Sequence, residues 1–211
     1  MRIDCEMEIL DKFPVVPVLV IDDASWAGEL GACLVDAGMP LVEVTLRTAQ
    51  SWRAVAAMRT VAGLTVGLGS VTKTSDLIKG KELGVDFAVS AGLSEDLIMY
   101  ARNEGIPYLP GVATPSELLR STQLGVEIVK WFPAETLGGI PALKAISAPF
   151  PSLRFVPTGG INIKNANTYL QEKNVIAVGG SWMFDRDSMS NKDVAKIAWN
   201  IKKAVEMMEA S

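Results

Sequence analysis

The chain has 211 residues, of which 49% are hydrophobic, and its 20 basic and 24 acidic residues give a formal net charge of −4. This length predicts a single domain spanning residues 1–211, and the interspersed charges exclude the basic surface of a nucleic-acid-binding protein. The chain has no histidine, which excludes Ser-His and Cys-His nucleophile systems and histidine metal sites.

The chain begins with a charged segment, and we expect residues 1–13 to form a short additional helix. This segment lacks the apolar core of a signal peptide, and no apolar run is long enough to span a bilayer, so we expect no membrane association. Cys5 and Cys33 show neither CxxC spacing nor a disulfide framework. Reduced structural thiols in a cytoplasmic protein are the interpretation that this cysteine usage favours.

Short apolar runs alternate with amphipathic stretches along the rest of the chain. We expect strands at 15–21, 41–46, 65–68, 87–89, 108–109, 127–132, 154–157 and 176–178. We expect helices at 26–37, 51–61, 74–83, 95–103, 116–124, 141–147, 163–170 and 191–209. Eight strand–helix units predict an α/β fold whose parallel sheet closes into a (β/α)8 TIM barrel, and a doubly wound open sheet is the alternative.

The second predicted strand carries polar residues at every other position. Val42, Val44 and Leu46 share one face, which suits contact with helices, while the alternate residues are expected to point into the barrel. These inward residues are Leu41, Glu43, Thr45 and Arg47. A solvated edge strand shows the same alternation, and a structural ion pair of Glu43 with Arg47 is a further alternative.

The sixth predicted strand places one lysine, Lys130, among apolar residues. Lys130 lies on the same face of this strand as Ile128 and Phe132, so we expect it to face inward as Glu43 does. Burial disfavours the ammonium form, and a neutral lysine amine is a nucleophile that forms Schiff bases with ketones. A lysine that extends from the strand end to solvent is the alternative.

Glycine pairs follow the last two predicted strands, in Pro157-Thr-Gly-Gly160 and Val178-Gly-Gly-Ser181. Glycines let backbone amides approach an anion closely, and barrel phosphate sites commonly lie after the seventh and eighth strands. Ser181 could add a hydroxyl donor, and Ser70 in Gly67-Leu-Gly-Ser-Val71 could donate to a substrate carboxylate. Ordinary turns are the alternative for each motif.

Together these motifs resemble the 2-keto-3-deoxy-6-phosphogluconate (KDPG) aldolase family, which overlaps in activity with 4-hydroxy-2-oxoglutarate aldolase. The resemblance runs from Val15 to Trp182 and is carried by Val42-Glu-Val-Thr-Leu-Arg-Thr48, Gly67-Leu-Gly-Ser-Val71, Leu109-Pro-Gly-Val-Ala-Thr114, Val129-Lys-Trp-Phe-Pro-Ala-Glu135 and Val156-Pro-Thr-Gly-Gly-Ile161. It implies a homotrimeric (β/α)8 class I aldolase that acts on a small 2-keto acid and needs no metal or cofactor.

The resemblance also implies roles for individual residues. It implies that Lys130 is the Schiff-base lysine, that Glu43 is the general acid/base and that Arg47 binds the pyruvate carboxylate. Phe132 and Thr158 match positions that line the pocket in the family. The residues that match its phosphate-binding loops are Gly159, Gly160, Gly180 and Ser181.

Three positions depart from the family pattern. Ser70 stands where the family usually has threonine, and Ala91 stands where it typically has proline, in the loop after the fourth strand. Trp131 replaces a more usual phenylalanine, and we expect it on the helix-facing side. These departures bear on substrate preference and on the pocket wall at Ala91 more than on the type of reaction.

The expected activity is cleavage of KDPG to pyruvate and glyceraldehyde 3-phosphate, a step of the Entner-Doudoroff pathway. Alternatives within the class are 4-hydroxy-2-oxoglutarate and 2-keto-3-deoxy-6-phosphogalactonate as substrates. Outside it, the alternatives are a phosphate-binding isomerase or synthase in which Lys130 acts only as a charge, and a non-catalytic barrel scaffold.

Overall fold

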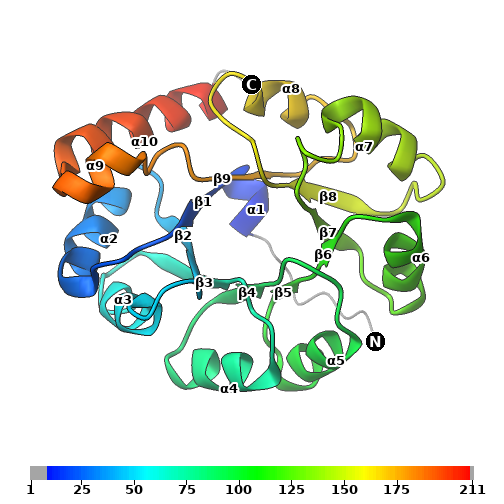
Figure 1. Ribbon diagram of the computed structural model, residues 1–211, viewed down its shortest axis with the longest axis horizontal. Coiled ribbons are helices and arrows are strands. Elements are labelled where there is room, and N and C mark those ends of the chain that lie inside the picture. The colour runs from blue at the N-terminus through cyan, green and yellow to red at the C-terminus, as the bar shows by residue number, and fades with distance from the viewer. Residues whose placement is uncertain (1–8, 210–211) are drawn as a thin grey trace.

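The computed structural model describes residues 9–209 and shows strands alternating with helices along the chain (Figure 1). The strands are β1 (Val15–Leu19), β2 (Leu41–Thr45), β3 (Thr65–Gly69), β4 (Phe87–Val89), β5 (Tyr108–Leu109), β6 (Gly111–Val112), β7 (Ile128–Trp131), β8 (Arg154–Pro157) and β9 (Val178–Gly180). The helices are α1 (Ile9–Lys12), η1 (Ala24–Trp26), α2 (Ala27–Asp36), α3 (Ser51–Met58), α4 (Thr74–Glu82), α5 (Glu95–Glu104), α6 (Pro115–Gln123), α7 (Gly139–Ser147), α8 (Ala166–Leu170), α9 (Arg186–Asn191) and α10 (Val194–Glu209).

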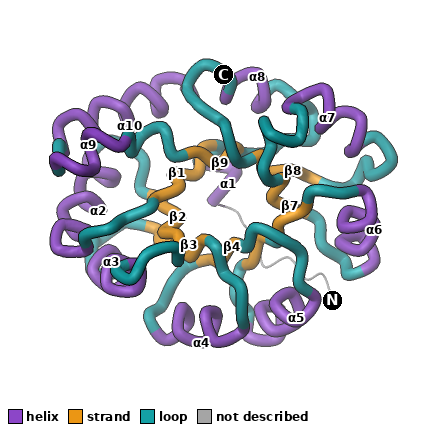
Figure 2. Tube along the Cα trace, in the orientation of Figure 1, coloured by secondary structure: helices purple, strands orange, loops and turns teal. Residues whose placement is uncertain are grey.

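The strands pair in parallel in two ladders, with the orders β5-β4-β3-β2-β1-β9 and β6-β7-β8. A parallel bridge between Thr158 and Gly179 links the end of β8 to β9. Pro110 alone separates β5 from β6, and a proline cannot donate to a strand ladder. Figure 2 shows the strands arranged around the centre of the molecule, with α1 inside their ring and the other helices outside it.

Apolar side chains form two clusters, one on each side of the strands. Val42 and Val44 belong to the larger cluster between strands and helices, whereas Leu41 belongs to the smaller inner cluster. The alternation predicted for β2 is therefore confirmed. Trp131 of β7 also lies in the outer cluster, on the helix-facing side as expected.

The short helix α1 contributes to the inner cluster through Leu10, which is buried together with Val16, Leu41 and Val156. Figure 1 shows α1 within the outline of the strands, so this helix packs against the apolar end of the interior. Of the helix expected over residues 1–13, the structure shows Ile9–Lys12, and residues 1–8 lie outside the described part of the chain.

The predicted last strand, 176–178, is wrong by two residues, because β9 is formed by Val178–Gly180. Its register pairs Val15 with Val178 and Pro17 with Gly180. The two glycines read as loop residues are therefore strand residues. They suit this place because a Cβ at Gly179 would lie 2.3 Å from Oγ1 of Thr158, so the sheet requires a residue without a side chain here.

The predicted C-terminal helix, 191–209, begins three residues too early, because α10 is formed by Val194–Glu209, and the separate helix α9 before it was not predicted. Helix α9 ends at Asn191, and Lys192 has a left-handed backbone conformation with φ of 52° before α10 begins at Val194. A residue in the left-handed conformation lets the last carbonyl groups of a helix find hydrogen-bond partners, and the helix ends there. Within residues 9–209, none of the helices has both the length and the hydropathy needed to cross a bilayer.

Candidate active site

A buried pair of opposite charges lies inside the strands. Nζ of Lys130, on β7, donates hydrogen bonds to Oε1 and Oε2 of Glu43, on β2, at 3.1 and 3.5 Å. The Lys130 side chain is 4% exposed and the Glu43 side chain 3%. The alternative of a lysine reaching to solvent is therefore wrong. The alternative of an ion pair between Glu43 and Arg47 is also not what the structure shows, because Glu43 pairs with Lys130.

This contact spans the interior from one side to the other. Three strands, β3, β4 and β5, follow β2 in one ladder, and β6 comes immediately before β7 in the other. Side chains from such distant strands meet only across a narrow, enclosed space. In that space each charge has the other as its partner, which is the condition under which buried charges are tolerated.

Gly69, at the end of β3, makes room for Glu43. A Cβ at this position would lie 2.2 Å from Oε1 and 2.8 Å from Cγ of Glu43. Such distances are far below van der Waals contact, so the neighbouring strand must carry a glycine for the carboxylate to point at Lys130. Sequence reasoning assigned no role to Gly69, although its position in the Gly67-Leu-Gly-Ser-Val71 motif was noted.

Replacing Gly69 with alanine is expected to lower stability and activity together. The new methyl group overpacks the interior, which costs about 1–3 kcal/mol, and displaces the Glu43 carboxylate from Lys130. Thermal unfolding followed by circular dichroism measures the first effect. Gly28→Ala is a matched control, because nothing lies within 4 Å of a Cβ added there. Equal melting temperatures for the two variants would contradict the packing role of Gly69.

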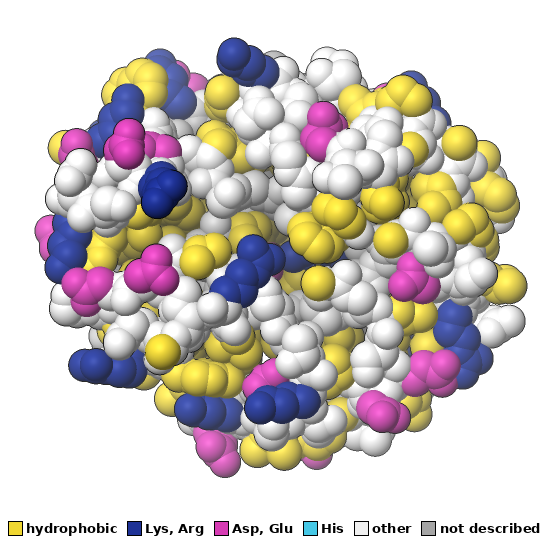
Figure 3. Space-filling model, in the orientation of Figure 1, with side chains coloured by type: hydrophobic (Ala, Val, Ile, Leu, Met, Phe, Trp, Pro, Cys, Tyr) yellow, Lys and Arg dark blue, Asp and Glu magenta, His cyan; other side chains and the backbone are white. Residues whose placement is uncertain are grey.

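Arg47 lies two residues beyond β2 and is exposed at its carboxyl end. Its Nε donates a hydrogen bond to Oγ of Ser70 at 2.9 Å, and Ser70 has φ of 59° in the turn that follows β3. The structure thus brings Arg47 and Ser70 together at the mouth of the interior. Figure 3 shows Lys and Arg side chains in the middle of this face, among apolar and uncharged side chains.

The predicted pocket residues Phe132 and Thr158 follow β7 and β8. The Phe132 ring centroid lies 5.7 Å from Nζ of Lys130, so the ring flanks the amine. Thr158 is buried, and its hydroxyl is 3.4 Å from the carbonyl oxygen of Val156. Both side chains therefore lie near the carboxyl ends of strands that border the buried pair.

The predicted phosphate-binding glycines fall into two groups. Gly159 and Gly160 have φ of 98° and 79° in the turn after β8, a conformation that favours glycine. Gly180 ends β9, and a Cβ there would lie 1.8 Å from the Trp182 ring. Ser181 is exposed directly after it.

Ala91 is exposed in the loop after β4, and this loop is held by residues that sequence reasoning did not assign to the site. Oγ of Ser90 accepts a hydrogen bond from the Tyr108 hydroxyl at 2.7 Å and donates one to the carbonyl oxygen of Gly92 at 2.7 Å. Burial raises the pKa of Tyr108 to about 12, so its hydroxyl stays a donor. A Cβ at Gly111 would lie 2.3 Å from the Ala91 backbone, so β6 and this loop pack directly together.

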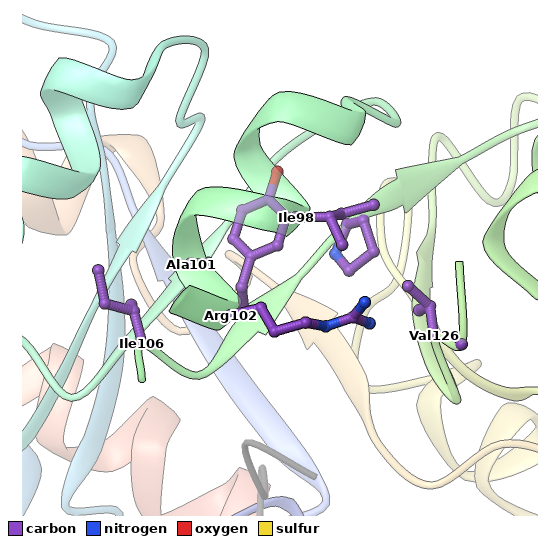
Figure 4. A pocket seen from close by; sticks show the side chains of 8 residues that line it. Ile98, Ala101, Arg102, Ile106 and Val126 are labelled. Carbon is purple, nitrogen blue, oxygen red and sulfur yellow. The ribbon is translucent and has the colours of Figure 1, made fainter. Parts of the chain in front are cut away.

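A small cavity of about 70 Å³ is lined by Tyr108 and by residues that have no predicted role in the site. Figure 4 shows Ile98, Ala101 and Arg102 of α5 lining it together with Ile106 and Val126. The Arg102 guanidinium donates a hydrogen bond to the carbonyl oxygen of Leu124 at 2.8 Å. This contact links α5 to the chain that follows α6.

The described residues contain no group of three or more Asp, Glu, Cys or His side chains arranged to hold a metal ion. The polar groups of the site are instead an amine, a carboxylate, a guanidinium and hydroxyls. An amine beside a carboxylate can exchange a proton and attack a carbonyl carbon. The fold and this pair define a class, namely parallel α/β proteins with a lysine–carboxylate pair enclosed by their strands.

Comparisons with known proteins agree with this class. The family model described as KDPG and KHG aldolase matches residues 7–199. The chain belongs to the KDPG and KHG aldolase family. The 2-dehydro-3-deoxy-phosphogluconate aldolase of Dickeya dadantii (strain 3937) is 40% identical over 199 residues, which cover 94% of this chain and 93% of that protein.

Two solved structures are similar over nearly the whole chain. The 2-keto-3-deoxy-6-phosphogluconate aldolase of Zymomonas mobilis ZM4 with 3-phosphoglycerate has a TM-score of 0.90 and 39% identity, covering 97% of this chain and 96% of that one. The KDPG aldolase of Legionella pneumophila, with pyruvate captured at low pH as a covalent carbinolamine intermediate, has a TM-score of 0.88 and 36% identity, covering 93% and 96%.

Proposed function

We propose that this protein is a class I aldolase, a lyase that cleaves KDPG into pyruvate and glyceraldehyde 3-phosphate through a Schiff base on Lys130. The observation that carries the proposal is the buried contact of 3.1 Å between Nζ of Lys130 and Oε1 of Glu43, in a chain of the KDPG and KHG aldolase family. A covalent carbinolamine of pyruvate in the Legionella relative supports the same chemistry here.

Proton transfer within the buried pair starts the reaction. Glu43 accepts a proton from the Lys130 ammonium, and the amine lone pair attacks the C2 ketone carbon of the substrate. The C2 oxygen is protonated and leaves as water, which gives a positively charged iminium. Because the iminium is itself an electron sink, the scheme needs neither a metal ion nor a cofactor.

Cleavage follows from the iminium. Glu43, through a water molecule, removes the proton of the C4 hydroxyl, and the electrons of the C3–C4 bond move toward the iminium nitrogen. Glyceraldehyde 3-phosphate leaves and an enamine remains on Lys130. Protonation of the enamine at C3 and hydrolysis of the iminium release pyruvate and restore the amine.

The remaining site residues bind and orient the substrate in this proposal. Arg47 holds the C1 carboxylate through the paired hydrogen bonds that a guanidinium offers, and Ser70 both contacts Arg47 and donates to the same carboxylate. Phe132 and Thr158 border the reacting carbons, and Ala91 forms part of the pocket wall. Fixing the ketone against the amine contributes several kcal/mol to catalysis, on the order of 7–11 in the best intramolecular cases.

The distal phosphate is bound by the turns after the last two strands in this proposal. Gly159 and Gly160 present backbone amides after β8, and Gly180 and Ser181 do so at the end of β9. The left-handed conformations of Gly159 and Gly160 support this assignment, because successive amides in such turns form anion-binding concavities.

We also infer that the two ladders form one closed (β/α)8 barrel in a single domain spanning 1–211. The inference counts β5 and β6 as one strand interrupted at Pro110. The bridge between Thr158 and Gly179 and the contact between Lys130 and Glu43 across the interior support it. In a closed barrel of eight strands, side chains fill the interior, as the inner apolar cluster does here.

The assembly and location of the protein are proposals as well. We propose a homotrimer that works in the cytoplasm, supported by the resemblance of its motifs to a family of trimeric aldolases and by its buried free thiol at Cys33. Light scattering in solution tests the assembly, since three chains have three times the mass of 22.6 kDa. A mass of one or two chains would contradict it.

A coupled assay for pyruvate release tests the proposed function. KDPG, its galactonate epimer and 4-hydroxy-2-oxoglutarate are compared at equal concentration, and we expect the highest kcat/KM for KDPG. The names of the relatives support this order. Absence of pyruvate with all three keto acids would support a non-catalytic scaffold instead. Turnover that survives borohydride in the presence of substrate would favour an isomerase or synthase.

A further inference from the structure

A second polar pair, which the mechanism does not use, lies beside the turn after β8. Tyr169, on α8, is buried, and its hydroxyl donates a hydrogen bond to Oε1 of Glu135. Burial, together with the hydrogen bond to Glu135 and the charge of that carboxylate, raises the pKa of Tyr169 above its ordinary value. The phenol therefore keeps its proton and acts as a donor.

Glu135 packs directly against the turn that we assign to phosphate binding. A Cβ at Gly160 would lie 2.5 Å from Cβ and 2.6 Å from Cγ of Glu135, so the stem of Glu135 contacts the turn backbone. The backbone amide of Glu135 also donates to the carbonyl oxygen of Gly159 at 3.0 Å, and that of Ala134 donates to Thr158 at 2.8 Å. One short segment after β7 thus holds the whole turn 158–160.

Two asparagines hold the other end of the same turn. Nδ2 of Asn162 and Nδ2 of Asn165 each donate to the carbonyl oxygen of Gly160 at 3.2 Å. Hydrogen bonds on its carbonyl groups and packing against Glu135 fix the peptide planes of the turn. The direction in which its amides point is consequently set by neighbouring residues.

The start of α7 lies beside the pair, at a pocket that Glu135, Gly139 and Tyr169 help to line. A Cβ at Gly139 would lie 3.2 Å from Oε1 of Glu135 and 3.4 Å from the Tyr169 hydroxyl, so α7 borders the hydrogen bond on that side. Gly139 also has φ of 63°, which a larger residue rarely adopts. Glu135 is otherwise exposed, so the Tyr169 hydroxyl is the described contact that fixes its carboxylate.

We propose that Tyr169 and Glu135 are positioning residues for the substrate phosphate. Tyr169 holds Glu135 against Gly160, and this contact keeps the turn amides in the orientation that the phosphate oxygens need. The inference rests on the proposed function, because it assumes that the turn binds that phosphate. It makes the pair a determinant of the preference for phosphorylated over unphosphorylated keto acids.

The test compares Tyr169→Phe with the wild type on KDPG and on 4-hydroxy-2-oxoglutarate, which has no phosphate. We expect the KM for KDPG to rise about tenfold, as for one hydrogen bond to a charged group, with kcat unchanged. We expect kcat/KM for 4-hydroxy-2-oxoglutarate to stay at the wild-type value. Phenylalanine keeps the buried ring, and Tyr100→Phe, on α5, is the matched control for loss of a phenol elsewhere.

Calorimetric titration with inorganic phosphate gives a second readout that does not depend on turnover. Tyr169→Phe should weaken phosphate binding by the same factor, Glu135→Ala should do likewise, and Glu135→Gln should retain most binding because its amide oxygen still accepts the hydrogen bond. Equal losses on both keto acids, or unchanged phosphate binding in Tyr169→Phe, would overturn the inference. A wild type that binds phosphate but releases no pyruvate would refute the proposed function alone, and the titrations would still decide the role of the pair.

Discussion

Replacing Lys130 with methionine is expected to abolish pyruvate release from KDPG and to remove the adduct that borohydride traps in the presence of pyruvate. Methionine has a similar length and fills the same apolar surroundings, but it has no amine to attack the ketone. The rate is expected to fall on the order of a thousandfold or more, as when a nucleophile is removed from other enzymes. Pyruvate release and peptide mass mapping of the reduced protein measure the two effects.

The substitution also changes stability, and this effect must be separated from the chemistry. Lys130→Met leaves the Glu43 carboxylate buried without its cation, and breaking a buried pair costs about 3–5 kcal/mol. Adding Glu43→Gln removes the unpaired charge, so the double variant should regain part of the lost stability while remaining inactive. Recovery of activity together with stability would mean that Lys130 is structural.

Lys144 provides the matched control for this experiment. It lies on α7, is exposed, and pairs with Glu172 at 2.9 Å. Lys144→Met should release pyruvate at the wild-type rate and should carry the trapped adduct on Lys130. An adduct found on Lys144 in the wild type would contradict the proposed assignment.

The part of the site that could be predicted from the sequence depends on strand periodicity. Alternation in β2 places Glu43 on the face opposite to Val42 and Val44, and the parity of β7 places Lys130 inward with Ile128. Both follow from the two-residue period of a strand, and the structure confirms both. Their contact could be expected only once eight strand–helix units were read as a closed barrel.

Other features depend on tertiary contacts that a local pattern does not carry. The start of β9 is set by pairing with β1 and by the space that Thr158 needs beside Gly179. The apolar run at 176–178 therefore did not predict the bounds of this strand. The break at Lys192 needs a left-handed residue, and lysine gives no such signal. The predicted helix therefore began at residue 191 rather than at Val194, and α9 was missed.

Supporting residues were missed for a related reason. Ser90 and Tyr108 come from different strand–helix units, and the hydrogen bond between them appears only after folding. Tyr169 and Glu135 are 34 positions apart, and Glu135 stood in a quoted motif without a role. Glycines gave the clearest available signal, since Gly69 and Gly160 each lie where a carboxylate side chain packs against backbone.

The substitution Glu43→Gln is expected to lower kcat for KDPG by about a hundredfold to ten-thousandfold, the range typical of a lost general acid/base. The amide fills the same space beside Gly69 and can still accept a hydrogen bond from Lys130, so KM should change little. It cannot take the proton of the C4 hydroxyl, which must leave for the C3–C4 bond to break. Steady-state kinetics of pyruvate release measure this effect.

Imine formation should be less affected than cleavage in the same variant, and this difference identifies the step at which Glu43 acts. Water can carry the protons of carbinolamine dehydration, so borohydride should still trap pyruvate on Lys130 in Glu43→Gln, at a reduced rate. Glu172→Gln, which removes a partly buried carboxylate from the pair with Lys144, should match the wild type in both measurements. Cleavage at the wild-type rate in Glu43→Gln would exclude its acid–base role. Loss of the trapped adduct in parallel with cleavage would instead assign Glu43 to the activation of the lysine amine, because both reactions require that amine to be free of its extra proton.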